Sequence, residues 1–426
     1  MDLIAAVATD ASGPLPTMLP KSPSRASLAS SAEAGDDASA SLTLCETASG
    51  VDVPHAKSAP AASAHSREIR LLDLSPEDLD VAQALGDRNP AAIECLRINR
   101  CRMTGEGFSS LVDVLCTYDL PHLRTIDISQ NRVGGAQAGA ALAKLLAHAG
   151  TVRFLSLGWN QLVLADLKAM AAPETSAYAI QTLDLRANPL GGPSSVRKQR
   201  KRAGKGDAKD GSDEAWIGAL AASLPCLTHL QLAQATVDDG SLVTLLHALT
   251  GQHSRIEYIG LEWLGLGARL ATVRSIMSGL VPADFASAPC MLHLNLAANN
   301  LGDAGIKIIA ESGARLSSLT LACNFITERG AGMIAKWLPS SGLTALELCD
   351  NYFGDQGIAS LLTTDGRRLS SDSPYCQLMS LGLNSCCLTD TSLRAIADAL
   401  TYNWAPLQSL HILRNNRVSP GARVAL

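Results

Sequence analysis

Aromatic residues are scarce in this chain of 426 residues: they make up 4% of it, whereas hydrophobic residues make up 47%. A large core must therefore be assembled from Leu, Ile, Val and Ala, which suits regular stacks of similar small units. Basic residues are not in excess, because the formal net charge is −5 at pH 7, so no nucleic-acid-binding surface is expected. An uncharged apolar run of about 18 residues is also absent, and we expect neither a membrane-spanning helix nor a membrane partner.

Secretory and metal-binding signatures are missing as well. The N-terminal stretch carries Asp2 where a signal peptide has basic residues. There are 11 cysteines, but none is arranged as Cys-x-x-Cys, so neither a disulfide framework nor a zinc site is expected. The pattern favours a reduced, cytoplasmic protein whose cysteines act mainly as small core residues.

The sequence contains none of the common catalytic motifs. A phosphate-binding Gly-x-x-x-x-Gly-Lys-Ser/Thr loop, His-Glu-x-x-His and Gly-x-Ser-x-Gly are all absent. The adjacent Cys386 and Cys387 should point their side chains apart, which predicts no metal site. We therefore predict that the protein is not an enzyme and has no catalytic residue, no metal and no cofactor.

What the chain does contain is a repeated pattern of leucine and asparagine. The stretch LHLNLAANNLGDAG, residues 292–305, places an Asn three residues after Leu-x-Leu. Written as L-x-x-L-x-L-x-x-N-x-L, the pattern fits 11 places, spaced 25 to 35 residues apart except for one interval of 47. The copies begin at Ile93, Leu123, Val152, Ile180, Leu227, Ile256, Met291, Leu316, Leu343, Leu378 and Leu407.

Each copy predicts one short strand followed by one helix. Gly-rich turns and a helical spacing of apolar residues follow most copies, as in GDAGIKIIAES, residues 302–312. A single unit of this size cannot bury its apolar face, so neighbouring units must stack and share a continuous core. We predict an α/β solenoid shaped like a horseshoe, with about 11 repeats, a parallel β-sheet on the concave face and helices on the convex face.

Most copies place asparagine at the ninth position of the template, where the chain turns away from the strand. Buried backbone groups at such a turn need partners, which an asparagine side chain can supply. Ala235 and Leu264 occupy this position in two central copies, so those turns should be looser or bonded differently, and two further copies have cysteine there. We predict a structural ladder of hydrogen bonds formed by Asn131, Asn160, Asn188, Asn299, Asn324, Asn351 and Asn415.

The pattern resembles the leucine-rich repeat, and specifically the ribonuclease-inhibitor type, in which repeats of about 28 residues carry full helices. The resemblance covers residues 93–420. The family includes ribonuclease inhibitor, the Ran GTPase activators, the sensor halves of NOD-like receptors and axonemal scaffold subunits. Its common property is protein binding, so the resemblance implies a protein partner whose identity the fold does not specify.

The repeat pattern also divides the chain into segments. Residues 1–66 are rich in Ala, Ser and Pro and predict a disordered tail. Residues 67–92 predict an N-terminal capping helix, with Ser75 and Pro76 at its start. Residues 93–426 form the array, which has an inserted loop at about 191–213.

The inserted loop carries a run of positive charge: Arg197, Lys198, Arg200, Lys201 and Arg202. Two interpretations are open for it. The run could act as a nuclear-import signal read by an import receptor, or as a contact for an acidic partner. Alternatively, it is a flexible, solvated loop with no partner.

One aromatic cluster is predicted on the concave face. His229, Tyr258 and His293 occupy the third position of three consecutive copies, with Glu262 and Trp263 beside them. Exposed Tyr and Trp side chains can bury much area at little entropic cost, so this cluster is the leading candidate for partner contact.

A second, weaker patch is predicted nearer the N-terminus. It consists of Phe154, Trp159 and Arg186, together with two aspartates at the fifth position of neighbouring copies. For both patches the alternative is structural: the rings shield turns that lack asparagine, or the tryptophans tuck under the loops.

These observations favour a non-catalytic scaffold or adaptor that binds a partner protein on the concave face. The resemblance leaves two alternatives open. One is a GTPase-activating protein of the Ran-activator type, with Arg97 and Arg186 as exposed candidates, although the acidic C-terminal tail of many such activators is absent. The other is a structural subunit of a cytoskeletal or axonemal assembly. The expected location is therefore cytoplasmic, with nuclear, cytoskeletal or ciliary association as further options.

Overall fold

The computed structural model describes residues 68–72, 89–171, 177–191, 212–251, 255–280, 292–362, 375–402, 404–415 and 417–419. Contacts divide the chain into residues 1–60 and 61–426, and every described element belongs to the second unit. The tail predicted over residues 1–66 and the cations of the basic loop, residues 197–202, lie outside the described residues.

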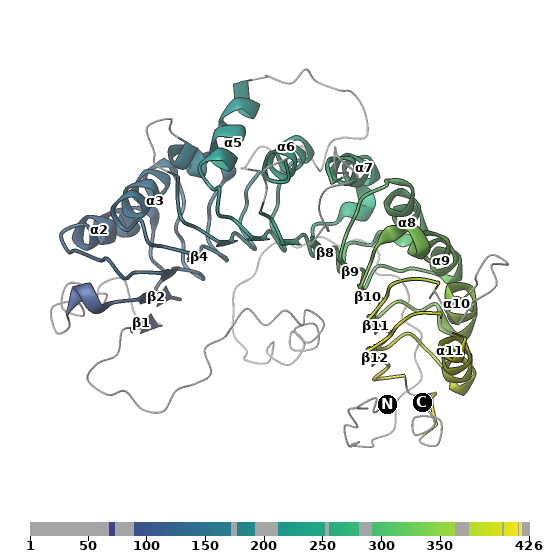
Figure 1. Ribbon diagram of the computed structural model, residues 1–426. Helices are drawn as coiled ribbons and strands as arrows, with labels where there is room; N and C mark the ends of the chain where they lie inside the picture. The colour runs from purple at the N-terminus through teal and green to yellow at the C-terminus, as the bar shows by residue number, and fades with distance from the viewer. Residues whose placement is uncertain are drawn as a thin grey trace, which may run out of the picture. The chain divides into compact units, whose positions relative to one another are not determined.

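One parallel sheet of 12 strands, paired in sequence order, forms the centre of the fold. Figure 1 shows the strands along the inner side of an arc and the helices along its outer side. The sheet is open, and the predicted horseshoe-shaped α/β solenoid is confirmed. The strands are β1 Glu68–Leu72, β2 Cys95–Asn99, β3 Thr125–Asp127, β4 Phe154–Ser156, β5 Thr182–Asp184, β6 His229–Gln231, β7 Tyr258–Gly260, β8 His293–Asn295, β9 Ser318–Thr320, β10 Ala345–Glu347, β11 Ser380–Gly382 and β12 Ser409–His411.

Helices connect most of these strands on the convex side. None of the helices in the described ranges is long and apolar enough to cross a membrane. The α-helices are α2 Gly105–Leu115, α3 Ala136–His148, α5 Ser212–Ala222, α6 Asp239–Leu249, α7 Leu270–Gly279, α8 Gly302–Glu311, α9 Glu328–Ser341, α10 Gly354–Leu361 and α11 Asp390–Thr401. Shorter 3-10 helices are η1 Pro90–Ala92, η2 Leu164–Ala171 and η3 Leu266–Ala268.

The Leu-x-Leu motif places two side chains of each copy in the core. In the copy that contains β8, Leu294 and Leu296 are buried, whereas His293 is half-buried on the opposite face of the sheet. Side chains alternate between the faces of a strand, so the third and fifth template positions line the concave face. Each buried leucine contributes about 1.5–3 kcal/mol, and stacking shares this core between neighbouring repeats.

The eighth template position has a left-handed backbone in all 11 copies. Trp159 has a φ of 57° and Trp263 a φ of 61°, although neither is glycine. This conformation costs about 1–2 kcal/mol in a residue with a side chain, and here it turns the chain out of the strand. The indoles are consequently carried to the surface, where Trp159 is 51% and Trp263 is 54% exposed.

The N-terminal segment contains a strand that the sequence did not predict. Within residues 67–92, the segment predicted as a capping helix that starts at Ser75 and Pro76, Glu68–Leu72 form strand β1, which pairs in parallel with β2. Ile69 is buried in this strand and extends the core by one unit. The strand escapes the template because it reads Ile-x-Leu without a following Asn. Residues 73–88, where the helix was expected, lie outside the described residues.

Candidate functional site

Asparagine side chains bond each turn to the turn of the preceding repeat. Asn299 Oδ1 accepts from the backbone N–H groups of Leu264 at 3.0 Å and Leu266 at 3.2 Å. Its Nδ2 donates to the carbonyls of Leu261 at 2.8 Å and Leu296 at 3.0 Å. The side chain is fully buried, so these bonds satisfy backbone groups that water cannot reach. The other asparagines at this position are also buried: Asn131, Asn160, Asn188, Asn324, Asn351 and Asn415.

Each asparagine bonds the turn of the repeat before it, so the effect of a missing asparagine appears one repeat earlier in the array. Because Asn299 follows Leu264 in the array, the Leu264 turn is bonded in the ordinary way. The irregular turns lie one repeat earlier: Ala235 N–H donates to Leu232 O at 3.0 Å, and Leu190 N–H to Asn188 O at 2.9 Å. A turn whose successor lacks asparagine therefore bonds to its own backbone.

The predicted aromatic cluster is assembled by the register of the sheet. Tyr258 pairs with His229 on one side and with His293 on the other. The His229 and Tyr258 rings are stacked with centroids 5.9 Å apart, and Tyr258 meets His293 edge-on at 5.1 Å. Burial, together with the neighbouring His229, lowers the pKa of His293. All three rings are half-buried, so they form a fixed ridge across three strands.

A buried carboxylate lies beside this ridge. Glu262 is 8% exposed, and its Oε1 accepts from Asn295 Nδ2 at 2.6 Å, from the Tyr258 hydroxyl at 3.3 Å and from Gln231 Nε2 at 3.4 Å. Glu262 Oε2 has no hydrogen-bond partner among the described residues. Burial raises the pKa of Glu262. Burial also raises the pKa of Tyr258, and the nearby charge of Glu262 raises it further.

Gly260 leaves room for this arrangement. A Cβ on Gly260 would overlap Gln231 Oε1 and come within 2.8 Å of Glu262 Oε2. Gln231 Oε1 is also buried without a partner among the described residues. The glycine thus leaves room for the Gln231 and Glu262 side chains to lie directly over the strand.

The second predicted patch is connected to the first through Arg186. Arg186 Nε donates to both Asp184 oxygens, at 3.0 Å and 2.9 Å, and the Asp184 side chain is buried. The Arg186 guanidinium also interacts electrostatically with Glu262 and Tyr258. Phe154 is half-buried on the concave face, whereas Trp159 is exposed at the strand exit.

Three residues of this site were not singled out in the sequence: Gln231, Gly260 and Asn295. All occupy the fifth template position of consecutive copies, between the ridge and Glu262. The signal that could have found them is Gly260 itself, because a glycine inside a strand often marks a close approach of other atoms.

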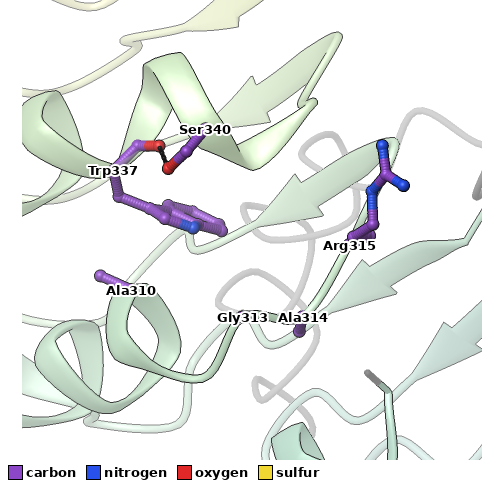
Figure 2. Close-up of a pocket in the computed structure, with 6 residues that line it drawn as sticks. All are labelled: Ala310, Gly313, Ala314, Arg315, Trp337 and Ser340. Carbon is purple, nitrogen blue, oxygen red and sulfur yellow. Dashed lines mark hydrogen bonds between the residues drawn. The ribbon is translucent and has the colours of Figure 1, made fainter. Parts of the chain in front are cut away.

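A depression of about 440 Å³ lies near the ends of α8 and α9. Figure 2 shows the residues that line it: Ala310, Gly313, Ala314, Arg315, Trp337 and Ser340. This lining contains no carboxylate or imidazole, so it offers no acid–base pair. Within the described ranges, no group of three His, Cys, Asp or Glu side chains could hold a metal ion.

The repeat region is similar to known proteins. A family model described as leucine-rich repeat matches residues 287–310. Ribonuclease inhibitor of Sus scrofa is 28% identical over 340 residues, covering 73% of this chain and 68% of the inhibitor. Ribonuclease inhibitor of Mus musculus is 32% identical over 141 residues, covering 32% of this chain and 29% of the inhibitor.

A relative with further domains matches a shorter part. NACHT, LRR and PYD domains-containing protein 14 of Mus musculus is 29% identical over 182 residues, which cover 42% of this chain and 17% of that protein. The match to the Sus scrofa inhibitor, in contrast, covers most of this chain. Together with the parallel sheet and the asparagine turns, these matches support a leucine-rich repeat protein of the ribonuclease-inhibitor type.

Proposed function

We propose that the protein is a non-catalytic scaffold or adaptor that binds a partner protein on the concave face of its array. The observation that carries this proposal is the ridge of His229, Tyr258 and His293, which lies across three adjacent strands. Similarity to ribonuclease inhibitor, a protein named for binding another protein, supports the same class of function.

The ridge has the physical properties of a contact centre. Its rings are already held by their neighbours, so a partner that covers them would immobilise few rotatable bonds. Trp263 belongs to the same repeat as Tyr258, and its indole is exposed where the chain leaves the strand. Binding energy at protein interfaces is concentrated in aromatic anchors of this kind.

The two arginines considered for GTPase activation are engaged within the array. Arg97 NH1 lies 3.2 Å from Glu68 Oε1, and Arg186 is held by Asp184. No observation favours the activator or the assembly subunit over the scaffold, and we propose neither.

The test is affinity purification from native cells followed by mass spectrometry. One bait is the wild-type chain, and the second carries His229→Glu, Tyr258→Glu and His293→Glu. A matched control carries Ser318→Glu, Ser380→Glu and Ser409→Glu, which make the same charge change at the third template position of other strands. Circular dichroism checks that all three baits fold.

The proposal expects one or more partners to be lost from the ridge variant and retained by the control. Recovery of the same set by all three baits would place the binding site elsewhere and overturn the proposal.

A further inference from the structure

Exposed arginines lie where the chain leaves the strands of two consecutive repeats near the N-terminal end of the array. Arg102 and Arg132 occupy the tenth template position of these copies, and both side chains are exposed. None of the ion pairs among the described residues includes either of them. Arg100 is exposed in the same turn as Arg102. In a chain whose formal net charge is −5, these cations form a local surface of the opposite sign.

The backbone that carries the two arginines is held by the asparagine ladder. Asn131 Oδ1 accepts from the N–H groups on either side of Arg102, at 3.0 Å and 3.2 Å. Arg132 N–H donates to Met103 O at 2.8 Å, and Arg132 also forms a parallel β-bridge with Thr104. Because neighbouring strands lie about 4.8 Å apart, the two arginine side chains start from adjacent positions on one edge of the array.

An exposed indole continues this edge in the third repeat. Trp159 is 51% exposed and directly precedes Asn160. Asn160 Oδ1 accepts from the N–H of Val133, the residue after Arg132, at 3.0 Å. The turn that carries Trp159 is therefore bonded to the turn that carries Arg132. We call Arg102, Arg132 and Trp159 the arginine edge.

We propose that the arginine edge binds an extended acidic segment of a partner protein. The guanidiniums of Arg102 and Arg132 pair with carboxylates of the segment, and the Trp159 indole supplies apolar contact area beside them. The inference goes beyond the proposed function, because this surface lies at the strand exits and shares no residue with the ridge.

The spacing of the edge suits a polypeptide. Side chains on one face of an extended chain recur about every 6.6–6.8 Å, so two carboxylates can meet arginines that start about 4.8 Å apart and have long, flexible side chains. Guanidiniums form paired hydrogen bonds with carboxylates. Since both guanidiniums are exposed, a partner reaches them without displacing any side chain of the array.

A nucleic-acid strand fits this edge less well. Binding to a phosphate backbone relies on a long track of cations. Gln161 and Pro189 occupy the tenth position of the next two copies, so the run of cations at this position ends after two repeats. Asp127, on the concave face of the second repeat, accepts from Asn99 Nδ2 at 2.8 Å and adds a negative charge that repels phosphate.

The opposite edge of the same region provides an internal control. Arg124 and Arg153 are exposed at the second template position, where the chain enters the strands. Glu94 occupies this position one repeat earlier, and Arg124 N–H donates to Glu94 O at 2.9 Å. The entry edge thus carries charge of both signs. The exposed tryptophans of the described residues, Trp159 and Trp263, both lie at strand exits.

The experiment titrates the full chain with N-acetyl-hexaglutamate amide and follows the indole N–H signal of Trp159 by two-dimensional NMR. The chain has 5 tryptophans, and Trp159→Phe assigns the signal by its loss. We expect the probe to shift this signal with a dissociation constant on the order of 100 μM at low salt, and N-acetyl-hexaglutamine amide to bind at least about tenfold more weakly. The Trp263 signal should not move. Because the signal is local, binding of the probe elsewhere on the chain does not register.

Two pairs of substitutions identify the edge. Arg102→Glu with Arg132→Glu should weaken binding by more than about tenfold, whereas Arg124→Glu with Arg153→Glu makes the same charge change and should alter it by less than about twofold. Arg102→Gln with Arg132→Gln should weaken it several-fold, and it keeps the test decisive if the charge reversal impairs folding, which circular dichroism checks.

Three results would overturn the proposal. Both charge-reversed pairs could weaken the probe equally, the Arg102 and Arg132 variants could bind it as the wild-type chain does, or an oligo-dT of 12 nucleotides could shift the Trp159 signal at lower concentration than hexaglutamate. The first would reveal a general charge effect, and the last would identify a nucleic-acid surface.

This test is separate from that of the proposed function, because the two use variants with no residue in common. Loss of a partner from the ridge variant without a hexaglutamate shift at Trp159 would keep the scaffold and remove the arginine edge. A shift that depends on Arg102 and Arg132, with no partner lost from the ridge variant, would keep the edge and overturn the ridge as the docking centre.

Discussion

Two regions of the sheet place a carboxylate above a glycine, and they complete it differently. At β7 Gly260 lies beneath Glu262 of the same repeat, and at β11 Gly382 lies beneath Glu347 of the preceding repeat. Cys349 and His411 contact Glu347, whereas Glu262 keeps one oxygen without a partner among the described residues. A repeat array can thus place a carboxylate above a strand glycine more than once, and the neighbouring side chains determine whether both carboxylate oxygens find a partner.

The asparagine ladder separates the same two regions. It is continuous from Asn299 through Asn351 beneath the C-terminal strands, but Ala235 and Leu264 interrupt it beneath β6 and β7. Gln231 belongs to the repeat whose turn, at Ala235, bonds to its own backbone, whereas Glu262 belongs to the Leu264 turn, which Asn299 bonds in the ordinary way. On the N-terminal side the ladder is present again, at Asn131, Asn160 and Asn188.

The largest expected effect comes from removing a rung in the continuous part. Asn324→Ala should lower the free energy of unfolding by about 3 kcal/mol, because it leaves the N–H groups of Asn299 and Leu301 buried without an acceptor. Urea unfolding followed by circular dichroism measures the change. Cys386→Ala is the matched control at a rung where a thiol only donates, and it should cost about 1 kcal/mol. Equal costs would mean that the ladder is not what distinguishes the two regions.

Neutralising the two carboxylates should affect stability differently, and urea unfolding measures the difference. Glu262→Gln should raise the free energy of unfolding by about 1 kcal/mol at pH 8, because it removes a buried charge with an unpaired oxygen. Glu347→Gln should give no gain, because it weakens contacts to Cys349 and His411.

The gain at Glu262 should depend on pH with a defined sign. Burial raises the pKa of Glu262 above its unfolded value, so the folded state binds the proton more tightly. Stability is therefore lost as pH rises from the unfolded pKa, near 4.3, through the higher folded pKa. Thermal melts between pH 4 and 8 should show the advantage of Glu262→Gln only toward the upper end. An advantage that grows as the pH falls would contradict this.

Filling the glycine positions tests how firmly the side chains above them are held. Gly260→Ala and Gly382→Ala should each cost roughly 1 kcal/mol, because the added methyl group displaces only the flexible ends of Gln231 and Glu347. Urea unfolding of the two variants measures the cost. A much larger loss in either variant would mean that the side chain above its glycine cannot move aside.

The smallest effect concerns a second set of bonds between repeats, at the helix starts. Asp355 accepts from the backbone N–H and hydroxyl of Thr389 and from the Ser392 hydroxyl. Burial acts to raise the pKa of Asp355, but these hydrogen bonds outweigh it and the pKa is lowered. Asp355→Ala should cost about 0.5–1 kcal/mol at pH 7, since solvent screens much of the interaction.

That cost should vanish in acid. A lowered folded pKa gives stability that is present above the unfolded pKa and is lost as pH falls through the folded value. Thermal melts of wild type and Asp355→Ala should therefore converge as the carboxyl is protonated. A difference that persists at low pH would assign the effect to packing.

Much of the fold was accessible from the sequence because burial in a repeat protein is local and periodic. Leu294 and Leu296 predict a strand, and Asn299 predicts the turn after it, without information from distant residues. Strand β1 was missed because one irregular copy carries too little of the pattern. The third template positions also identified the ridge, since the register of a parallel solenoid brings equivalent positions together.

The state of individual side chains could not be predicted in this way. That Glu262 turns toward Asn295, with its Oε2 buried and without a partner among the described residues, depends on three neighbouring strands at once. How successive repeats stack also determines which turn each asparagine bonds. As a result, Asn299 bonds the Leu264 turn, whereas the Ala235 turn bonds to its own backbone.

The sequence by itself determined the repeat, the parallel sheet and the line of residues on its concave face, because these follow from a periodic need to bury leucine. Only the tertiary structure decided which polar groups on that face are satisfied. Hydrogen bonds between repeats depend on distances and directions that a linear pattern does not contain, and beside Gly260 those distances leave two buried acceptors without a partner in the part of the chain that the structure describes.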